Sequence, residues 1–133
     1  MTLSCKAEEF LSPSDDNPWM LEIAKNWVAE IKGEPGNRNS GINVIAWSNK
    51  NPEASFGVIQ TILKLTEADA ELFNLAGAGP LESFLSSCSD EFAGLVFQVA
   101  QIDSRLRRAF QHVWQCGMPD ERFKQVQRYA QQL

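Results

Sequence analysis

The predicted fold depends most on residues 75–85, which read Leu75-Ala76-Gly77-Ala78-Gly79-Pro80-Leu81-Glu82-Ser83-Phe84-Leu85. Apolar residues follow a helical period on both sides of this stretch. Gly77 can adopt the left-handed backbone conformation that ends a helix, and Pro80 suits the first turn of the next helix. We therefore predict a structural joint, formed by Gly77, Gly79, Pro80 and Glu82, at which two helices meet.

The same stretch superficially resembles a phosphate-binding loop, because its glycines stand close together. It lacks the Lys-Ser/Thr pair of a P-loop, and no strand precedes it, so a phosphate site is not expected. Glu82 falls in the first turn of the second helix, where a carboxylate is stabilised by the exposed backbone N–H groups. A structural role is therefore favoured for the whole stretch.

Amphipathic patterns predict helices on the N-terminal side of this joint. Helices are expected at 19–32 and 52–65, each opened by an Asn-Pro pair in which the Asn caps the helix. Between them, Ile42–Trp47 is a short apolar run that periodicity alone cannot assign. A short helix is favoured there, because a single strand would have no partner elsewhere in the chain.

Cap and break signals divide the rest of the chain into further helices. Thr66 is expected to open a short helix through a capping box in which Asp69 takes the usual place of Glu. Further caps and breaks are expected at Ser89, Asp103, Gly117 and Pro119. In the last two helices, the residues expected to face inward are Leu106, Ala109, Phe110, Val113, Trp114, Phe123, Val126 and Ala130.

Together these elements predict an all-α fold. Short connections favour an irregular bundle of seven or eight helices in antiparallel hairpins, and a short α-solenoid over 52–116 is the alternative. Residues 1–17 are polar and rich in turn formers, so they are expected to form a flexible N-terminal segment. Residues 18–133 are expected to form a single helical domain.

Several motifs carry a family resemblance, namely Trp27, Asn51-Pro52-Glu53, Ala76 to Glu82 with Phe84-Leu85, Arg107 with Ala109-Phe110, and Val113-Trp114. From Trp27 to the C-terminus the chain resembles an uncharacterised family of small bacterial helical proteins, a domain of unknown function. Where that family has a His-Gly pair, this chain has Cys88-Ser89. The resemblance implies an all-α fold and brings no activity with it.

The charge of the chain limits the kinds of partner it can bind. Its 12 Lys and Arg residues and 17 Asp and Glu residues give a net charge of −5, which argues against generic nucleic-acid binding. Residues 1–102 hold 6 basic and 14 acidic residues (net −8), whereas residues 103–133 hold 6 and 3 (net +3). The C-terminal quarter is therefore a basic patch on an acidic body.

The apolar residues and the cysteines indicate the cellular compartment in which the protein is expected. No stretch approaches the roughly 20 apolar residues that a membrane span needs, so no membrane association is expected. The three cysteines, Cys5, Cys88 and Cys116, match no metal or redox spacing. A reduced, cytoplasmic setting is expected, with no cofactor and no metal.

Three residues of the basic patch share one predicted helical face. Arg105, Arg108 and His112 are spaced i, i+3 and i+7, and could together receive an acidic or phosphorylated partner. Pairing with the protein's own carboxylates, or a solvated face, is the alternative. His112 is the only histidine in the chain, so a multi-histidine metal site cannot form. No partner for a Cys/His dyad or a Ser/His/Asp triad is in obvious reach of it, and no catalytic residue is assigned.

Two functions from different classes remain open. The leading hypothesis is a small cytosolic protein-interaction module of an immunity-like or regulatory kind, either monomeric or a weak homodimer, whose acidic body meets a protein partner. The alternative is a ligand-binding or enzymatic helical domain with a pocket between helices near Glu82 and Trp114.

Overall fold

Two long helices cross at the base of the molecule and hold much of its core. The computed structural model describes residues 5–33, 51–115 and 117–132; in it, α2 spans Pro18–Ile31 and α4 spans Pro52–Thr66. These two helices contact each other more extensively than any other pair of elements. The predicted helices at 19–32 and 52–65 are thereby confirmed to within one residue at each end.

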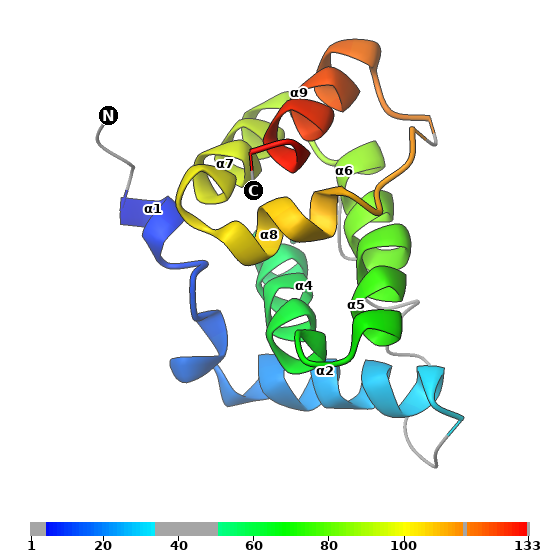
Figure 1. The fold of residues 1–133 in the computed structure, drawn as a ribbon. Coiled ribbons are helices and arrows are strands. Elements are labelled where there is room, and N and C mark those ends of the chain that lie inside the picture. The colour runs from blue at the N-terminus through cyan, green and yellow to red at the C-terminus, as the bar shows by residue number, and fades with distance from the viewer. Residues whose placement is uncertain (1–4, 34–50, 116, 133) are drawn as a thin grey trace.

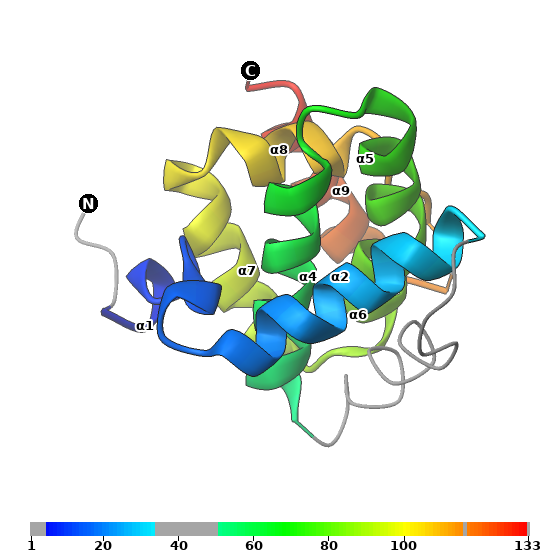
Figure 2. The same ribbon diagram turned by 90° about the horizontal axis from the view of Figure 1, so that it is seen from below.

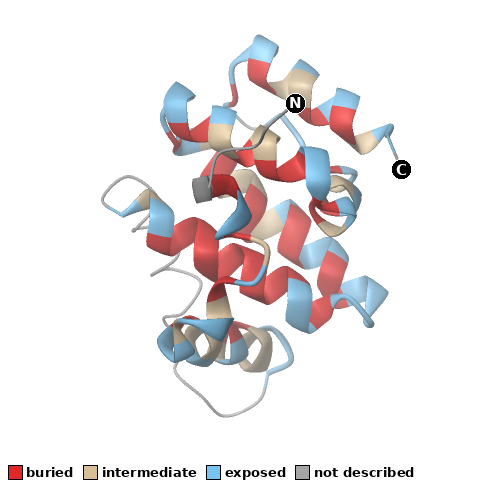
Figure 3. Ribbon diagram, turned by 90° about the vertical axis from the view of Figure 1, so that its left-hand side faces the viewer, coloured by how far each residue is buried: buried red, intermediate tan, exposed pale blue. Residues whose placement is uncertain are grey.

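Helix α4 lies at the centre of the fold. Every residue from 54 to 63 is buried, whereas an amphipathic surface helix would bury only one stripe. Figure 2, a view from below, shows α2 passing in front of α4, with α7 on one side of α4 and α5 on the other. The outer helices bury one side and expose the other (Figure 3). The chain thus packs around one helix as an irregular bundle.

The predicted joint is a continuous helix, not a boundary between two helices. Helix α5 (Ala70–Ala76), a π-helical turn (Gly77–Leu81) and α6 (Glu82–Ser87) follow one another without a break. Gly77 has φ −68° and ψ −46°, which is right-handed helical geometry. The prediction that Gly77 ends a helix, and that two separate helices meet at this joint, was wrong.

The π turn explains how the helix passes Pro80. A proline ring inside an α-helix clashes with the carbonyl four residues back and removes one hydrogen bond. Here the helix widens, so that the Glu82 N–H donates to the Gly77 carbonyl five residues back. The wider turn lets the chain continue beyond the proline without ending the helix.

Gly77 is needed for packing and not for a turn. A Cβ at this position would lie 2.7 Å from the Ala109 carbonyl oxygen and 3.1 Å from the Cβ of His112. The chain around residues 109–112 therefore approaches the backbone of the π turn more closely than any side chain would allow. By contrast, a Cβ added to Gly79 would meet no atom within 4 Å.

The helix caps agree with the sequence at three positions and differ at two. Asn17 precedes α2 as predicted, but its side chain makes no capping hydrogen bond and its Nδ2 donates to the Pro13 carbonyl at 3.2 Å instead. Asn51, Ser89 and Asp103 accept hydrogen bonds from backbone N–H groups at the starts of α4, α7 and α8. Thr66 caps nothing, because it remains within α4 and donates its hydroxyl to the Ile62 carbonyl at 2.8 Å. Asp69 caps α5 instead, accepting from the Leu72 N–H at 3.2 Å.

The last three helices form the upper layer of the molecule (Figure 1). They are α7 (Asp90–Ile102), α8 (Ser104–Phe110) and α9 (Asp120–Ala130). Phe97 of α7 stacks on Tyr129 of α9, with ring centroids 5.7 Å apart. Helix α8 ends at Phe110, four residues before Trp114, so the prediction that Trp114 faces inward on this helix was wrong.

The N-terminal segment belongs to the core. Helix α1 (Cys5–Glu8) and a 3₁₀ turn (Pro13–Asp15) precede α2. Ala7 and Phe10 are buried, and the Phe10 ring lies 5.0 Å from that of Phe56. The prediction of a separate flexible segment over 1–17 is corrected for residues 5–17; residues 1–4 lie outside the described part.

The fold is all-α, as predicted. Within residues 5–33, 51–115 and 117–132 there is no strand. Because α1 is a single turn and α5 continues into α6, the described residues form six helices, whereas seven or eight were predicted for the whole chain. The helix predicted at Ile42–Trp47 lies outside the described residues.

Candidate functional site

The three residues predicted to form a basic face have different neighbours in the structure. Arg105 Nε donates to Glu67 Oε2 at 2.8 Å. The guanidinium of Arg108 lies over the Phe73 ring, 4.6 Å from its centroid. His112 lies beyond the end of α8 and is partly buried. Both arginines have partners within the chain, and a role for the three residues in binding another molecule stays a prediction.

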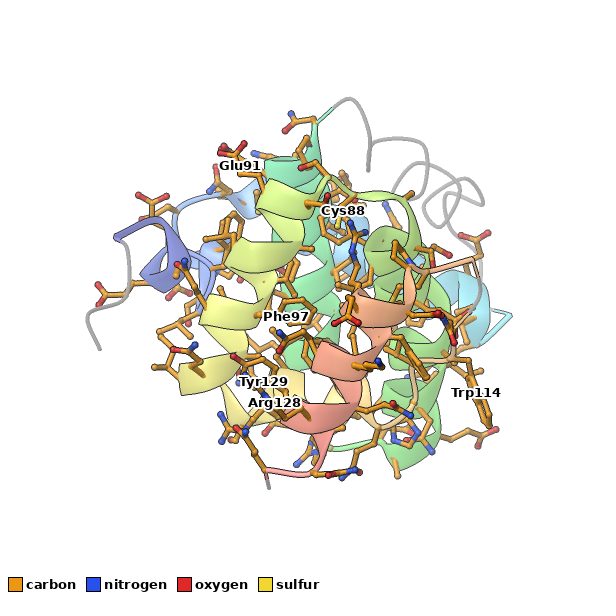
Figure 4. The ribbon with its side chains drawn as sticks, turned by 90° about the horizontal axis from the view of Figure 1, so that it is seen from above. Cys88, Glu91, Phe97, Trp114, Arg128 and Tyr129 are labelled. Atoms are coloured by element: carbon orange, nitrogen blue, oxygen red, sulfur yellow. The ribbon has the colours of Figure 1, made fainter. Side chains whose placement is uncertain are left out.

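The structure does bring Glu82 and Trp114 together. The backbone N–H of Trp114 donates to Glu82 Oε1 at 2.7 Å. Glu82 therefore binds the segment that follows α8, a role that its position in its own helix did not suggest. The Trp114 side chain stays outside the core, with 73% of its surface exposed, and Figure 4 shows it pointing away from the ribbon at the edge of the molecule.

A groove lies beside Trp114, between the end of α8 and one side of α9. Its volume is about 360 Å³. Its lining residues are Phe110, Gln111, Val113, Trp114, Phe123, Gln127, Ala130 and Gln131. We call these eight residues the Trp114 face. None of the eight side chains carries a charge, so the face offers apolar surface together with three amides.

The α9 wall of this groove is fastened to α6 and to the turn after it by Arg122. Its Nη1 donates to the carbonyls of Leu85 and Cys88 at 2.8 and 2.9 Å, and its Nη2 to Asp90 Oδ1 at 2.7 Å. The Arg122 side chain is 8% exposed and that of Asp90 is 99% exposed. Because water screens a carboxylate that exposed, the two carbonyl bonds fix Arg122 more firmly than the ion pair does.

Both walls of the groove are therefore attached to α6 and the turn after it. Glu82, at the start of α6, holds the backbone of Trp114, and the carbonyls of Leu85 and Cys88 hold α9 through Arg122. These contacts join residues more than 30 positions apart in the sequence. The Trp114 face is thus supported on both sides by the same short helix.

Sequence reasoning missed Arg122, although one signal pointed to it. Arg122, Val126 and Tyr129 follow one another at i, i+4 and i+7, and all three are buried. An arginine in line with buried apolar residues indicates a buried hydrogen-bonding role. Of the predicted stripe, Val126 is buried, and Phe123 and Ala130 are partly buried against the core. The buried side of α9 also includes Arg122 and Tyr129, which the prediction left out.

Cys88 gives no sign of a reactive thiol. Burial raises the pKa of its thiol above the ordinary value, and the nearby Arg122 guanidinium only partly opposes this effect. A raised pKa favours the protonated and less nucleophilic form. Among the described residues, no group of three or more His, Cys, Asp or Glu is arranged to hold a metal ion.

A second groove borders the π turn. It has a volume of about 290 Å³ and is lined by Trp27, Ile31, Leu75, Ala78, Gly79, Pro80 and Ser83. None of these side chains is charged, and Ser83 is the only one with a hydroxyl group. Because its lining offers only the Ser83 hydroxyl and the indole of Trp27 as polar side-chain groups, this groove has little with which to orient a ligand.

None of the helices in the described ranges is both long enough and apolar enough to cross a membrane.

Comparisons with known proteins identify the chain's family. No curated protein and no solved structure matches the chain significantly. A family model matches residues 39–133, which include α4 to α9 and the whole Trp114 face. The chain therefore belongs to DUF6869, a family of unknown function.

Proposed function

We propose that this protein is a small cytoplasmic protein-interaction module that binds its partner through the Trp114 face. The observation that carries the proposal is the exposure of Trp114. Among the large apolar side chains in the described ranges, it has the greatest exposed fraction, 73%, and the next has 44%. Tryptophan is among the residues that contribute most to binding energy in protein interfaces.

The support beneath Trp114 favours binding over incidental exposure. Its backbone is held by Glu82, and the facing wall is held by Arg122. A side chain on a fixed backbone loses less conformational freedom on binding than one on a loose segment does, so the interface is partly preorganised. The adjacent apolar groove would receive part of the partner and complete the exclusion of water from the indole.

The charge distribution is consistent with a regulatory role. Residues 1–102 carry a net charge of −8, which would speed association with a basic protein and disfavour an acidic one. The Trp114 face itself is neutral. Apolar contact would then supply most of the affinity, while the long-range field of the acidic body formed by residues 1–102 would select the partner, as in immunity-like neutralisation of a basic protein.

Affinity capture with matched variants tests the proposal. The wild type, Trp114→Ala and Trp19→Ala would be used in parallel as bait at moderate salt. Trp19 is a suitable control because it is also an exposed tryptophan, at 41%, and lies on α2, outside the Trp114 face. We expect the wild type and Trp19→Ala to recover the same stoichiometric protein and Trp114→Ala to lose it. Equal recovery by all three baits would contradict the proposal.

The size of the groove keeps ligand binding as a second candidate. Its volume of about 360 Å³ lies at the lower end of the range typical of small-molecule sites. Its neutral lining offers no acid or base for catalysis, so this alternative is a binding function rather than an enzymatic one. A thermal-shift screen of neutral metabolites would support it if a compound stabilised the wild type and not Phe123→Ala.

A further inference from the structure

We propose that the groove bordering the π turn docks a segment of a partner protein in which a basic residue stands next to large apolar residues. Past Ile31 and Leu75 the groove continues into a further hollow of about 250 Å³, which is also lined by Lys32, Asp69, Glu71 and Leu72. We call the two together the α2–α5 groove. Figure 1 shows the start of α5 above the last turns of α2. None of these lining residues belongs to the Trp114 face, so the inference goes beyond the proposed function.

Two exposed apolar side chains lie in the middle of the α2–α5 groove. Ile31 of α2 and Leu75 of α5 are 43% and 44% exposed, and both line both parts of the groove. Exposed apolar residues scattered singly are ordinary at a protein surface, whereas adjoining ones indicate an interaction site. An apolar side chain of a partner would cover Ile31 and Leu75 together and exclude water from both.

The end of the groove at the start of α5 carries an excess of negative charge. Its charged lining residues are Asp69, Glu71 and Lys32, which are two carboxylates against one ammonium group. In the part of the chain that the structure describes, no ion pair joins Lys32 to either carboxylate, whereas the nearby Glu67 is paired with Arg105. A basic side chain of a partner would therefore meet carboxylates that the chain itself leaves unpaired.

The order of these groups along the helix sets the order expected in the partner. Glu71 and Leu75 are four residues apart in α5 and therefore lie on the same side of it. Gly79 follows in the π turn and lines the apolar end of the groove. A basic side chain at Glu71 would thus place the adjacent apolar side chains against Leu75 and Gly79. An acidic segment would be repelled both here and by the net charge of −8 on residues 1–102.

Fluorescence anisotropy of four labelled peptides with the full chain tests the chemistry of the segment. The peptides share Gly-Ser ends and carry Lys-Arg-Leu-Leu, Lys-Arg-Ser-Ser, Glu-Asp-Leu-Leu or Glu-Asp-Ser-Ser at their centre. We expect only the first to bind, with a dissociation constant on the order of 0.1 mM, because the groove holds few side chains and exposed ion pairs contribute little. Raising the salt from about 50 to about 300 mM should weaken this binding at least twofold.

Two results would overturn the proposed chemistry. One is a Glu-Asp-Leu-Leu peptide that binds as well as the Lys-Arg-Leu-Leu peptide, since the acidic end of the groove would then select nothing. The other is the absence of binding by all four peptides up to about 1 mM.

Filling the groove with a side chain of the protein tests the place of binding. A Cβ at Gly79 would meet no atom within 4 Å, so Gly79→Leu can occupy the groove without displacing its walls. Gly94 on α7 is equally open and lies outside the groove, which makes Gly94→Leu the matched control. Gly79→Leu should weaken binding of the Lys-Arg-Leu-Leu peptide at least tenfold, and Gly94→Leu should leave it unchanged. Circular dichroism would verify that both variants are folded, and equal binding by both would overturn the inference.

A second pair of variants tests the acidic end of the groove. Glu71→Gln should weaken binding of the same peptide about two- to fivefold, the range expected for an exposed ion pair. Glu91 occupies the first turn of α7 as Glu71 does that of α5, and it lies outside the groove. Glu91→Gln should therefore have no effect. Equal losses in the two variants would show that the basic residue does not sit at Glu71.

The failure of this inference can be told apart from the failure of the proposed function. Trp114→Ala should bind the Lys-Arg-Leu-Leu peptide as tightly as the wild type does, because Trp114 lies outside the α2–α5 groove. Loss of peptide binding in Trp114→Ala would overturn the inference, since the peptide would then occupy the Trp114 face. The proposed function depends on the capture experiment with Trp114→Ala and does not depend on whether the peptide binds.

Discussion

Gly77 and Gly79 are two residues apart in the same π turn, yet their surroundings differ. At Gly77 a Cβ would lie 2.7 Å from the Ala109 carbonyl oxygen, which is backbone and cannot rotate away. At Gly79 a Cβ would meet no atom within 4 Å. Neither glycine has a positive φ. Only the packing of the 109–112 segment against the π turn distinguishes the two positions.

We expect Gly77→Ala to lower the free energy of unfolding by about 1–3 kcal/mol, because the added methyl group must push the chain at Ala109 away from the π turn. Gly79→Ala should leave stability unchanged or raise it by up to about 1 kcal/mol, since alanine restricts the unfolded chain more than glycine does. Urea unfolding followed by circular dichroism would measure both. Equal effects of the two substitutions would show that close packing is not the reason for Gly77.

At the scale of elements, the N-cap residues of α7 and α8 differ in how much of the structure they join. Ser89 Oγ accepts only from the Phe92 N–H at 3.2 Å, at the surface. Asp103 is buried; its Oδ1 accepts from the N–H groups of Arg105 and Leu106, and its Oδ2 from Gln60 Nε2 at 3.0 Å. Asp103 therefore joins the start of α8 to the centre of α4.

This difference predicts unequal costs for removing the two caps. Ser89→Ala should lower the free energy of unfolding by about 1 kcal/mol, the usual value for a lost cap. Asp103→Ala should lower it by about 2–4 kcal/mol, because a buried Gln60 donor loses its acceptor in addition. Chemical denaturation of both variants would test this order. A loss at Asp103 no larger than that at Ser89 would contradict the assignment of Asp103 as a buried link.

At the scale of the whole molecule, the N-terminal segment completes the core. Phe10 lies against Phe56 and Phe92, with ring centroids 5.0 and 6.2 Å away. Its carbonyl also accepts a hydrogen bond from Gln60 Nε2 at 3.0 Å. The aromatic centre of the bundle is therefore formed by residues that lie more than 80 positions apart in the chain.

We expect Phe10→Ala to lower the free energy of unfolding by about 3–5 kcal/mol, the usual cost of removing a buried phenylalanine. The neighbouring exposed residue provides the control, and Glu9→Ala should change stability by no more than about 0.5 kcal/mol. Thermal and urea unfolding of both variants would measure the difference. If Phe10→Ala were as mild as Glu9→Ala, the N-terminal segment would be the flexible appendage that its composition suggested.

The candidate site could be predicted only in part. Glu82 and Trp114 were paired in advance as the edge of a pocket, and the structure joins them by a 2.7 Å hydrogen bond. The exposure of Trp114 was missed, because extrapolating the α8 period beyond Phe110 put its side chain inward. Arg122 was missed because its partners are backbone carbonyls 34 and 37 positions away, which no local pattern can indicate.

The sequence alone determined the all-α class, the bounds of α2 and α4 and three of the helix caps. These features depend on contacts within a few residues, which periodicity and cap chemistry reveal. The tertiary structure decided that the 75–85 stretch continues as one helix, that Phe10 is buried and that Trp114 is not. Each of these outcomes depends on contacts between distant segments: Ala109 with Gly77, Phe10 with Phe92, and Glu82 with Trp114.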